Sequence, residues 1–317
     1  VYLEQSTSPI GKSDVDKTQN AIKGEFIPAK SWLVEDGKEI LENSKEKNVV
    51  LLAYGDPYIA TTHIELRARA IELKIETRSI HASSSLTSMI GECGLHFYKV
   101  GKIATIMSEM KSLTYPYYVI YKNIIEDNHT VLLLEYNQNK DFFLDPKDAL
   151  KGLLETEEGQ GRKVLTELSY AIVASRIGFK DQSIVSGKIS SLAKIDFGKP
   201  PHTVIIPGRL HFTESDALKL FGQCIDEPFD NSEKTEKISK QMMKKYVPMV
   251  REALEEIIPY YKNQKEFEVI LENAELYIEQ AEIFLDEGRD ENAILSIGYA
   301  DGLVDALRLA KGLEFKM

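Results

Sequence analysis

Apolar and polar positions change their spacing once along this chain, near residue 226. Upstream, from Asn48 to about Leu210, short apolar runs alternate with amphipathic segments, which is typical of an α/β region. Strands are expected at 49–54, 76–80, 103–107, 130–135, 170–175 and 203–206. Helices are expected at 61–73, 86–93, 118–125 and 146–155.

The last quarter of the chain has a purely helical pattern. Asp226-Glu-Pro-Phe-Asp-Asn-Ser232 is acidic and rich in turn residues, so it is interpreted as a linker. Pro248 is expected to kink or divide the helix that contains it, because proline has no amide donor. Apolar residues then recur at helical spacing in three stretches, 233–261, 265–287 and 290–311. This pattern predicts a small antiparallel bundle.

Composition narrows the class of protein. With 317 residues, 43% of them hydrophobic, the chain can bury a sizeable core. A net charge of −11 disfavours nonspecific binding to nucleic acid or to a membrane surface. Cys93 and Cys224 lie too far apart in sequence for a CxxC metal site and suggest no disulfide framework. No apolar run reaches membrane-spanning length, and a cytoplasmic location is predicted.

Common catalytic motifs do not occur in the sequence. All histidines lie in the α/β part, at positions 63, 81, 96, 129, 202 and 211. None of them forms the close pair on one helix face that a zinc site needs, so no metal is expected. The chain also lacks a Gly-x-Ser-x-Gly elbow and a phosphate-binding P-loop, which disfavours acyl-enzyme chemistry and nucleotide hydrolysis.

The most informative junction is Gly55-Asp-Pro, which follows the apolar run 49–53. A continuous apolar run is typical of a strand covered on both faces, and such sheets bind ligands at their carboxyl ends. Gly55 permits a ligand to approach the backbone, Asp56 offers a carboxylate, and Thr61 or Thr62 can cap the next helix. The same residues also fit an ordinary turn, so the junction alone leaves both readings open.

Five short motifs, taken in order, resemble the diphthine synthase family. They are Gly55-Asp-Pro-Tyr-Ile-Ala-Thr-Thr-His63, Ser79-Ile-His-Ala-Ser-Ser-Ser85, Gly94-Leu-His-Phe-Tyr-Lys-Val-Gly101, His129-Thr-Val-Leu-Leu-Leu134 and Phe197-Gly-Lys-Pro-Pro-His-Thr-Val-Ile-Ile-Pro-Gly-Arg-Leu-His211. Val1-Tyr-Leu-Glu also fits that family's second strand, and the likeness covers about residues 1–222.

This resemblance implies two α/β domains of the tetrapyrrole-methylase type with a cofactor cleft between them, followed by an all-α bundle. The expected segments are a first domain at 1–108, a second domain at 109–225, a linker at 226–232 and the bundle at 233–317. The stretch 293–315 in the bundle looks like a small archaeal helical domain of uncharacterised function, for which docking or oligomerisation is a more plausible role than catalysis.

The resemblance also implies an activity. Diphthine synthases use S-adenosylmethionine to methylate the amino group of a modified histidine on elongation factor 2, and the expected assembly is a homodimer. Such a transfer mainly requires a positioned amine, so no dedicated nucleophile is expected. His63, His96 or solvent could accept the amine proton, and the sequence leaves the catalytic group unassigned.

Matching motif positions imply a set of cofactor contacts. The set is Asp56, Ile59, Ser84, Ser85, Leu134, Ile177 and His202. The aliphatic members can form apolar walls around an adenine, and the polar members can fix its orientation by hydrogen bonds.

The sequence departs from the family's pattern at its amino end. The family begins with a further strand and a glycine-containing loop ahead of Val-Tyr-Leu-Glu, and these are expected to be missing here. Two alternatives therefore stand beside the diphthine synthase reading. One is another methylase of the same class, such as one that acts on a tetrapyrrole. The other is a catalytically impaired binding protein that kept the methylase fold.

Overall fold

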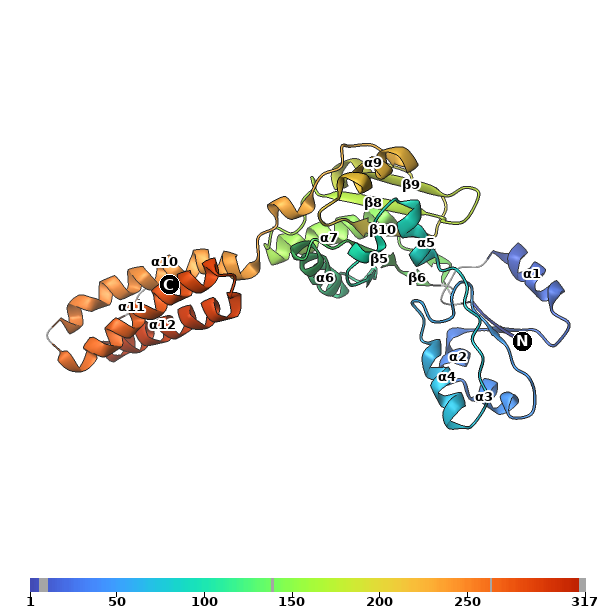
Figure 1. Cartoon of the computed structure of the whole chain (residues 1–317), viewed down its shortest axis with the longest axis horizontal. Helices are drawn as coiled ribbons and strands as arrows, with labels where there is room; N and C mark the ends of the chain where they lie inside the picture. The colour runs from blue at the N-terminus through green and yellow to red at the C-terminus, as the bar shows by residue number, and fades with distance from the viewer. Residues whose placement is uncertain (6–10, 138–139, 263, 314–317) are drawn as a thin grey trace. The chain divides into compact units, whose positions relative to one another are not determined.

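The computed structural model describes residues 1–5, 11–137, 140–262 and 264–313 of the chain (Figure 1). The chain divides into two compact units, Val1–Lys234 and Thr235–Met317. Every strand of the described residues belongs to the first unit, whereas the second unit contains only helices. The sequence-based boundaries at 108, 225 and 232 remain a proposal.

A small parallel sheet opens the first unit. Its strand order is β2-β1-β3, with β1 at Tyr2–Glu4, β2 at Ile27–Ala29 and β3 at Leu51–Leu52. The helices of this region are α1 (Lys12–Ala21), α2 (Ser31–Asp36), α3 (Lys38–Ser44) and α4 (His63–Glu72). Tyr2, Val34, Ile40 and Leu66 form the centre of one apolar cluster, so α2, α3 and α4 pack with the sheet.

The predictions of strands at 49–54 and 76–80 are wrong for most of their residues. β3 is only two residues long, and its neighbours Val50 and Tyr54 are 45% and 44% exposed. Residues 76–80 form no strand, and Ile80 is 78% exposed. The cause is the same for both segments: β3 is the last strand of the described sheet, so no ladder covers its second edge or holds 76–80 extended.

A mixed six-stranded sheet forms the main framework. Its order is β11-β9-β8-β10-β5-β4. These strands are β4 (Ala104–Ile106), β5 (Thr130–Leu134), β8 (Tyr170–Ser175), β9 (Ser183–Lys188), β10 (His202–Ile206) and β11 (Gln223–Cys224). The predictions of strands at 103–107, 130–135, 170–175 and 203–206 are confirmed. β9 was not predicted, because its sequence Ser-Ile-Val-Ser-Gly-Lys mixes small polar and apolar residues.

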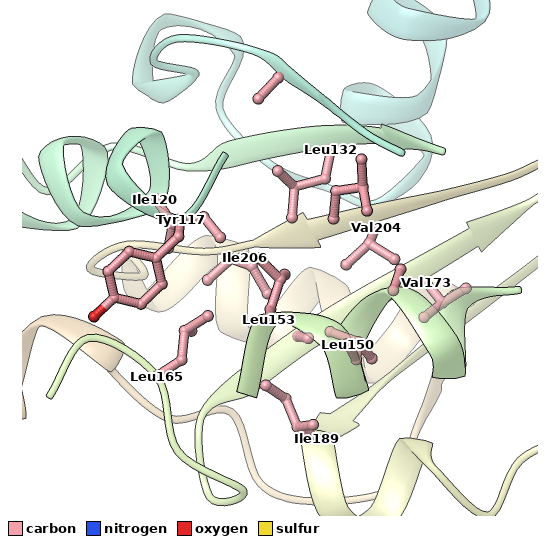
Figure 2. Packing of buried hydrophobic residues seen from close by; sticks show 14 of the residues in the cluster. Tyr117, Ile120, Leu132, Leu150, Leu153, Leu165, Val173, Ile189, Val204 and Ile206 are labelled. Carbon is pink, nitrogen blue, oxygen red and sulfur yellow. The ribbon is translucent and has the colours of Figure 1, made fainter. Parts of the chain in front are cut away.

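Helices cover both faces of this sheet. On one face lie α6 (Thr114–Ile125), α7 (Pro146–Gln160) and α8 (Ile189–Leu192), and on the other α5 (Ser85–Glu92) and α9 (Phe212–Phe221). Figure 2 shows Leu150 and Leu153 of α7 pointing toward Val204 and Ile206 of β10. Since both faces are covered, every residue of β8 is buried, which explains why its sequence is apolar up to Ser175.

Short elements complete the first unit. They are η1 (Phe97–Lys99), η2 (Met110–Ser112), η4 (Asn231–Lys234) and the antiparallel pair of β6 (Tyr136–Asn137) with β7 (Phe142–Phe143). β4 was expected in the first domain, but it pairs in parallel with β5 and so belongs to the six-stranded sheet.

A buried carboxylate ties the loops at one end of the six-stranded sheet. Glu214 accepts hydrogen bonds from the His129 ring at 2.9 Å, the Lys99 ammonium at 2.8 Å and the backbone amides of His96 at 2.8 Å and His211 at 2.7 Å. Burial alone would raise the pKa of Glu214. These four donors outweigh that effect and hold its pKa well below the ordinary value of 4.5.

The second unit is a three-helix bundle of α10 (Ile238–Tyr261), α11 (Lys265–Asp286) and α12 (Asp290–Ala310), as predicted (Figure 1). The Tyr261 hydroxyl donates to the Leu307 carbonyl at 2.7 Å, so the carboxyl ends of α10 and α12 lie together and α11 runs against both. Pro248 does not divide α10. Buried Val247 and Val250 flank it, and their packing offsets the lost hydrogen bond.

None of the helices in the described part of the chain combines the length and apolar character needed to cross a bilayer.

Replacing Glu214 with Gln should lower the free energy of unfolding by about 3 kcal/mol, because the half-buried Lys99 ammonium loses its ionic partner. Since folding lowers the pKa of Glu214, its stabilisation is fully present above about pH 4.5 and is lost as the pH falls below that value. Urea denaturation at pH 7 and pH 4 should show a smaller pH effect in the variant. Asp216→Asn, on the exposed side of the same helix, is the control and should change stability by less than about 0.5 kcal/mol.

Replacing Ile278 with Ala should destabilise the helical bundle by about 2–5 kcal/mol, because Ile278 is fully buried between the three helices. Hydrogen exchange of α11 peptides in the full chain, measured with increasing urea, reports the change. Val269→Ala on the same helix is the control, since Val269 is 63% exposed. Equal protection in the two variants would contradict the packing described here.

Candidate active site

The Gly-Asp-Pro loop is closed by the side chain of Asp56. Gly55 has φ +108°, a left-handed conformation that favours glycine. One Asp56 oxygen accepts the Tyr58 amide at 2.9 Å, and the other lies 2.8 Å from Nδ1 of His81. The bond from the Tyr58 amide outweighs burial and, together with His81, lowers the pKa of Asp56. The carboxylate is therefore ionised at neutral pH and organises the loop.

A second set of contacts holds the loop against the segment 79–85. The Tyr58 hydroxyl lies 2.5 Å from the Ser79 hydroxyl. A side chain at Gly55 would meet the Ser83 carbonyl at 3.6 Å, so the two backbones run close together. The structure thus brings Asp56 and half-buried Ile59 beside the segment that carries Ser84 and Ser85.

The two serines begin helix α5. The buried Ser84 hydroxyl accepts the Leu86 amide at 3.2 Å and so caps the helix, whereas Ser85 is exposed. The buried face of α5 packs on the six-stranded sheet, in a cluster that includes Ile177 at its margin. The serines are therefore anchored through α5 to the framework of the sheet.

The remaining predicted contacts gather at one end of the six-stranded sheet. Leu134 ends β5, His202 begins β10, and Ile177 follows the end of β8 at Ser175. They meet because β10 runs antiparallel to both β5 and β8. Nδ1 of His202 lies 2.8 Å from the Ser175 hydroxyl, and burial lowers the pKa of His202. This histidine is neutral at physiological pH.

The expected helix caps after the loop are wrong. Thr62 occupies the cap position of α4 but makes no capping bond with its side chain. Thr61 instead donates to the Pro57 carbonyl at 2.5 Å, and Nδ1 of His63 donates to the same carbonyl at 3.0 Å. The loop carbonyl attracts both donors, so these residues stabilise the turn. His63 is buried, which does not suit the proton acceptor suggested from the sequence.

An open cavity of about 400 Å³ lies elsewhere, at the Glu214 end of the six-stranded sheet. His96, Lys99, Arg209 and His211 are among its lining residues. Thr130 and Ile206 pair at this end, whereas Leu134 and His202 lie at the opposite end, so the cavity is not the predicted cofactor site. His96, which lines this cavity, therefore also lies at the opposite end of the sheet from Leu134 and His202.

One functional candidate was missed in the sequence, namely His81. It lies inside the motif Ser79-Ile-His-Ala-Ser-Ser-Ser85, but its partner Asp56 is 25 residues away. No local spacing rule connects two residues in different loops, so only the fold reveals the pair. Among the described residues, no group of three His, Cys, Asp or Glu side chains is placed to hold a metal ion.

Comparison with known proteins agrees with this fold. Residues 12–193 match the family of tetrapyrrole (corrin/porphyrin) methylases, and residues 245–313 match a family described as a protein of unknown function, DUF357. The second match covers most of the helical bundle.

Relatives with named functions identify the family within the tetrapyrrole methylases more closely. A diphthine synthase of Methanocaldococcus jannaschii is 34% identical over 230 residues, which are 71% of this chain and 89% of that protein. A diphthine synthase of Methanococcus maripaludis is 35% identical over 228 residues, again 71% of this chain and 89% of that protein. The structure is similar to a crystal structure of diphthine synthase with a TM-score of 0.62 and 30% identity, covering 71% of this chain and 85% of that one. The chain therefore belongs to the diphthine synthase family of tetrapyrrole-methylase-fold, S-adenosylmethionine-dependent methyltransferases, and carries an additional DUF357 helical domain.

Proposed function

We propose that this chain binds S-adenosylmethionine and methylates the amino group of a modified histidine on elongation factor 2, as a step of diphthamide biosynthesis. The observation that carries the proposal is the loop at Asp56, which is tied to the segment 79–85 in a chain that shares 34–35% identity with named diphthine synthases. The proposed reaction thus rests on the resemblance to diphthine synthases, and its proposed location rests on the loop at Asp56.

The residues of the site fit S-adenosylmethionine in their chemistry. Ile59, Leu134 and Ile177 are half-buried, so each keeps an apolar surface open to an adenine or a thioether chain. Gly55 lets a ligand approach the backbone, and exposed Ser85 offers a hydroxyl and an amide at the first turn of α5. Neutral His202 adds a polar group without placing a second positive charge near a sulfonium.

Asp56 is assigned a mainly organising part in this site. Both of its oxygens already accept hydrogen bonds within the loop, so its first effect is to hold the backbone in shape. When bound, S-adenosylmethionine supplies a methyl group on a positively charged sulfur. The chain must then position a neutral amine in line with that methyl group and exclude water from the same position.

The remaining expectations stay predictions. They are the homodimer, the cytoplasmic location and a docking or oligomerisation role of the helical bundle. The alternative is a binding protein that kept the methylase fold but has impaired activity. The following experiment distinguishes the two functions.

Calorimetric titration of the full chain with S-adenosylmethionine should show saturable binding. Asp56→Ala should weaken it by about 10–100-fold, which corresponds to about 1.4–2.8 kcal/mol for a loop that loses charge-assisted hydrogen bonds. Transfer of a radiolabelled methyl group to elongation factor 2 that carries the unmethylated precursor histidine then tests the activity. Glu72→Gln, exposed at the end of α4, is the control and should behave as wild type. Binding without transfer would favour the alternative, and no binding would refute the proposal.

A further inference from the structure

His81 and Asp56 form a carboxylate–imidazole pair at the surface of the candidate site. The Asp56 side chain is only 6% exposed, whereas that of His81 is 67% exposed, and 2.8 Å separates Oδ2 from Nδ1. One partner is therefore fixed in the protein, and the other projects into solvent from the same segment that carries Ser84 and Ser85.

The hydrogen bond determines which ring nitrogen of His81 carries the proton. An ionised carboxylate can only accept, and the pKa of Asp56 is lowered chiefly by the Tyr58 amide. Nδ1 of a neutral His81 must therefore be protonated and donate to Asp56. The lone pair is then on Nε2, to which the described residues offer no hydrogen-bond partner.

The neighbours of His81 hold the ring without competing for Nε2. The Tyr58 ring meets the imidazole edge-on with 5.8 Å between centroids, and its hydroxyl is held by Ser79. The guanidinium of exposed Arg67 lies 5.7 Å from the centre of the same Tyr58 ring. Asp56 is thus the ionisable group bonded to the imidazole, Tyr58 packs against its edge, and Arg67 contacts only the far partner, the Tyr58 ring.

We propose that His81 is a catalytic residue that accepts the proton of the substrate amine at Nε2, with Asp56 as the positioning residue that fixes its tautomer. This inference rests on the proposed methyl transfer to an amine. The pair adjoins the predicted cofactor contacts in sequence: Asp56 is one of them and precedes Ile59 by three positions, and His81 precedes Ser84 by three positions.

The reaction needs such an acceptor once for every methyl group. A primary or secondary amine is largely protonated at neutral pH, with reference pKa values of about 8–10. Its N–H bond must break, with the proton passing to Nε2 of His81, before the nitrogen lone pair can attack. The new N–C bond then forms as the C–S bond breaks, and the electron pair of that bond stays on sulfur. The imidazolium, stabilised by Asp56, returns its proton to water.

Other histidines lack this arrangement. His63 is 6% exposed and is held by the Pro57 carbonyl. His202 is paired with Ser175, and His129 is fully buried against Glu214. His96 and His211 line the cavity at the opposite end of the six-stranded sheet. His81 alone among the six histidines combines a carboxylate partner, high exposure and a place beside the Gly-Asp-Pro loop, and all six belong to the described residues.

The tautomer can be tested on the protein without any ligand. A long-range nitrogen–proton NMR spectrum of the full chain should show neutral His81 with its proton on Nδ1. Asp56→Asn should move the proton to Nε2, because an asparagine side chain can present its amide N–H to Nδ1. A wild-type His81 protonated on Nε2 would overturn the proposal, whatever the enzyme's activity.

Kinetics test the role in proton transfer. His81→Gln, whose side-chain amide can still donate to Asp56, should lower kcat by about 100-fold, the usual contribution of a general base, with a much smaller effect on calorimetric binding of S-adenosylmethionine. Because this variant has no imidazole at position 81, the acid-side limb of its kcat/KM should follow the protonation of the substrate amine alone and so differ from that of the wild type. Added imidazole should restore part of the activity of His81→Ala. Asp56→Asn should lower kcat in the wild type but not further in the His81→Ala background.

His211→Gln is the matched control, since it makes the same substitution at an exposed histidine at the far end of the sheet. It should keep the wild-type kcat and pH profile. Unchanged kcat and an unchanged acid limb in His81→Gln would refute the role of His81 while leaving the proposed function intact. A wild-type chain that binds S-adenosylmethionine but methylates no form of elongation factor 2 would instead refute the proposed function.

Discussion

The antiparallel pairing of β10 with both β5 and β8 is the constraint on which the first unit depends. Because β10 runs opposite to its two neighbours, the end of β5, the end of β8 and the start of β10 meet at one end of the sheet. Leu134, Ile177 and His202 come together for this reason. The same pairing sends the opposite strand ends to Glu214, whose carboxylate ties the loops there. The predicted cofactor contacts therefore lie at one end of the sheet, and the Glu214 network with its cavity lies at the other.

The small sheet depends on a different kind of stabilisation. Its three strands are two or three residues long, so their ladders contribute few hydrogen bonds. The loop that follows β3 is held instead by side chains: Asp56 binds the Tyr58 amide and His81, and Tyr58 meets Ser79. These contacts preserve the shape of the loop even though Val50 and Tyr54 beside it are partly exposed. The reactive pair proposed here is therefore also part of what keeps the loop in place.

The helical bundle carries its own core and its own family match. Its buried residues come from all three helices and include Val250, Ile278 and Ala300. Two prolines inside α10 are accommodated because the surrounding apolar face is packed along its whole length.

The sequence by itself determined the elements whose environment is uniform. Strands 130–135 and 170–175 are mostly apolar because helices cover both faces, and the bundle helices show one apolar stripe because one side faces the core. Ordered motifs were enough to indicate the family and the loop at Asp56. Tertiary structure alone decided the rest. Whether 49–54 and 76–80 become buried strands depends on neighbours that their own residues do not encode, and the pair of Asp56 with His81 joins positions 25 residues apart. Hydropathy reports the burial of a residue, whereas contacts between loops arise only when the chain has folded.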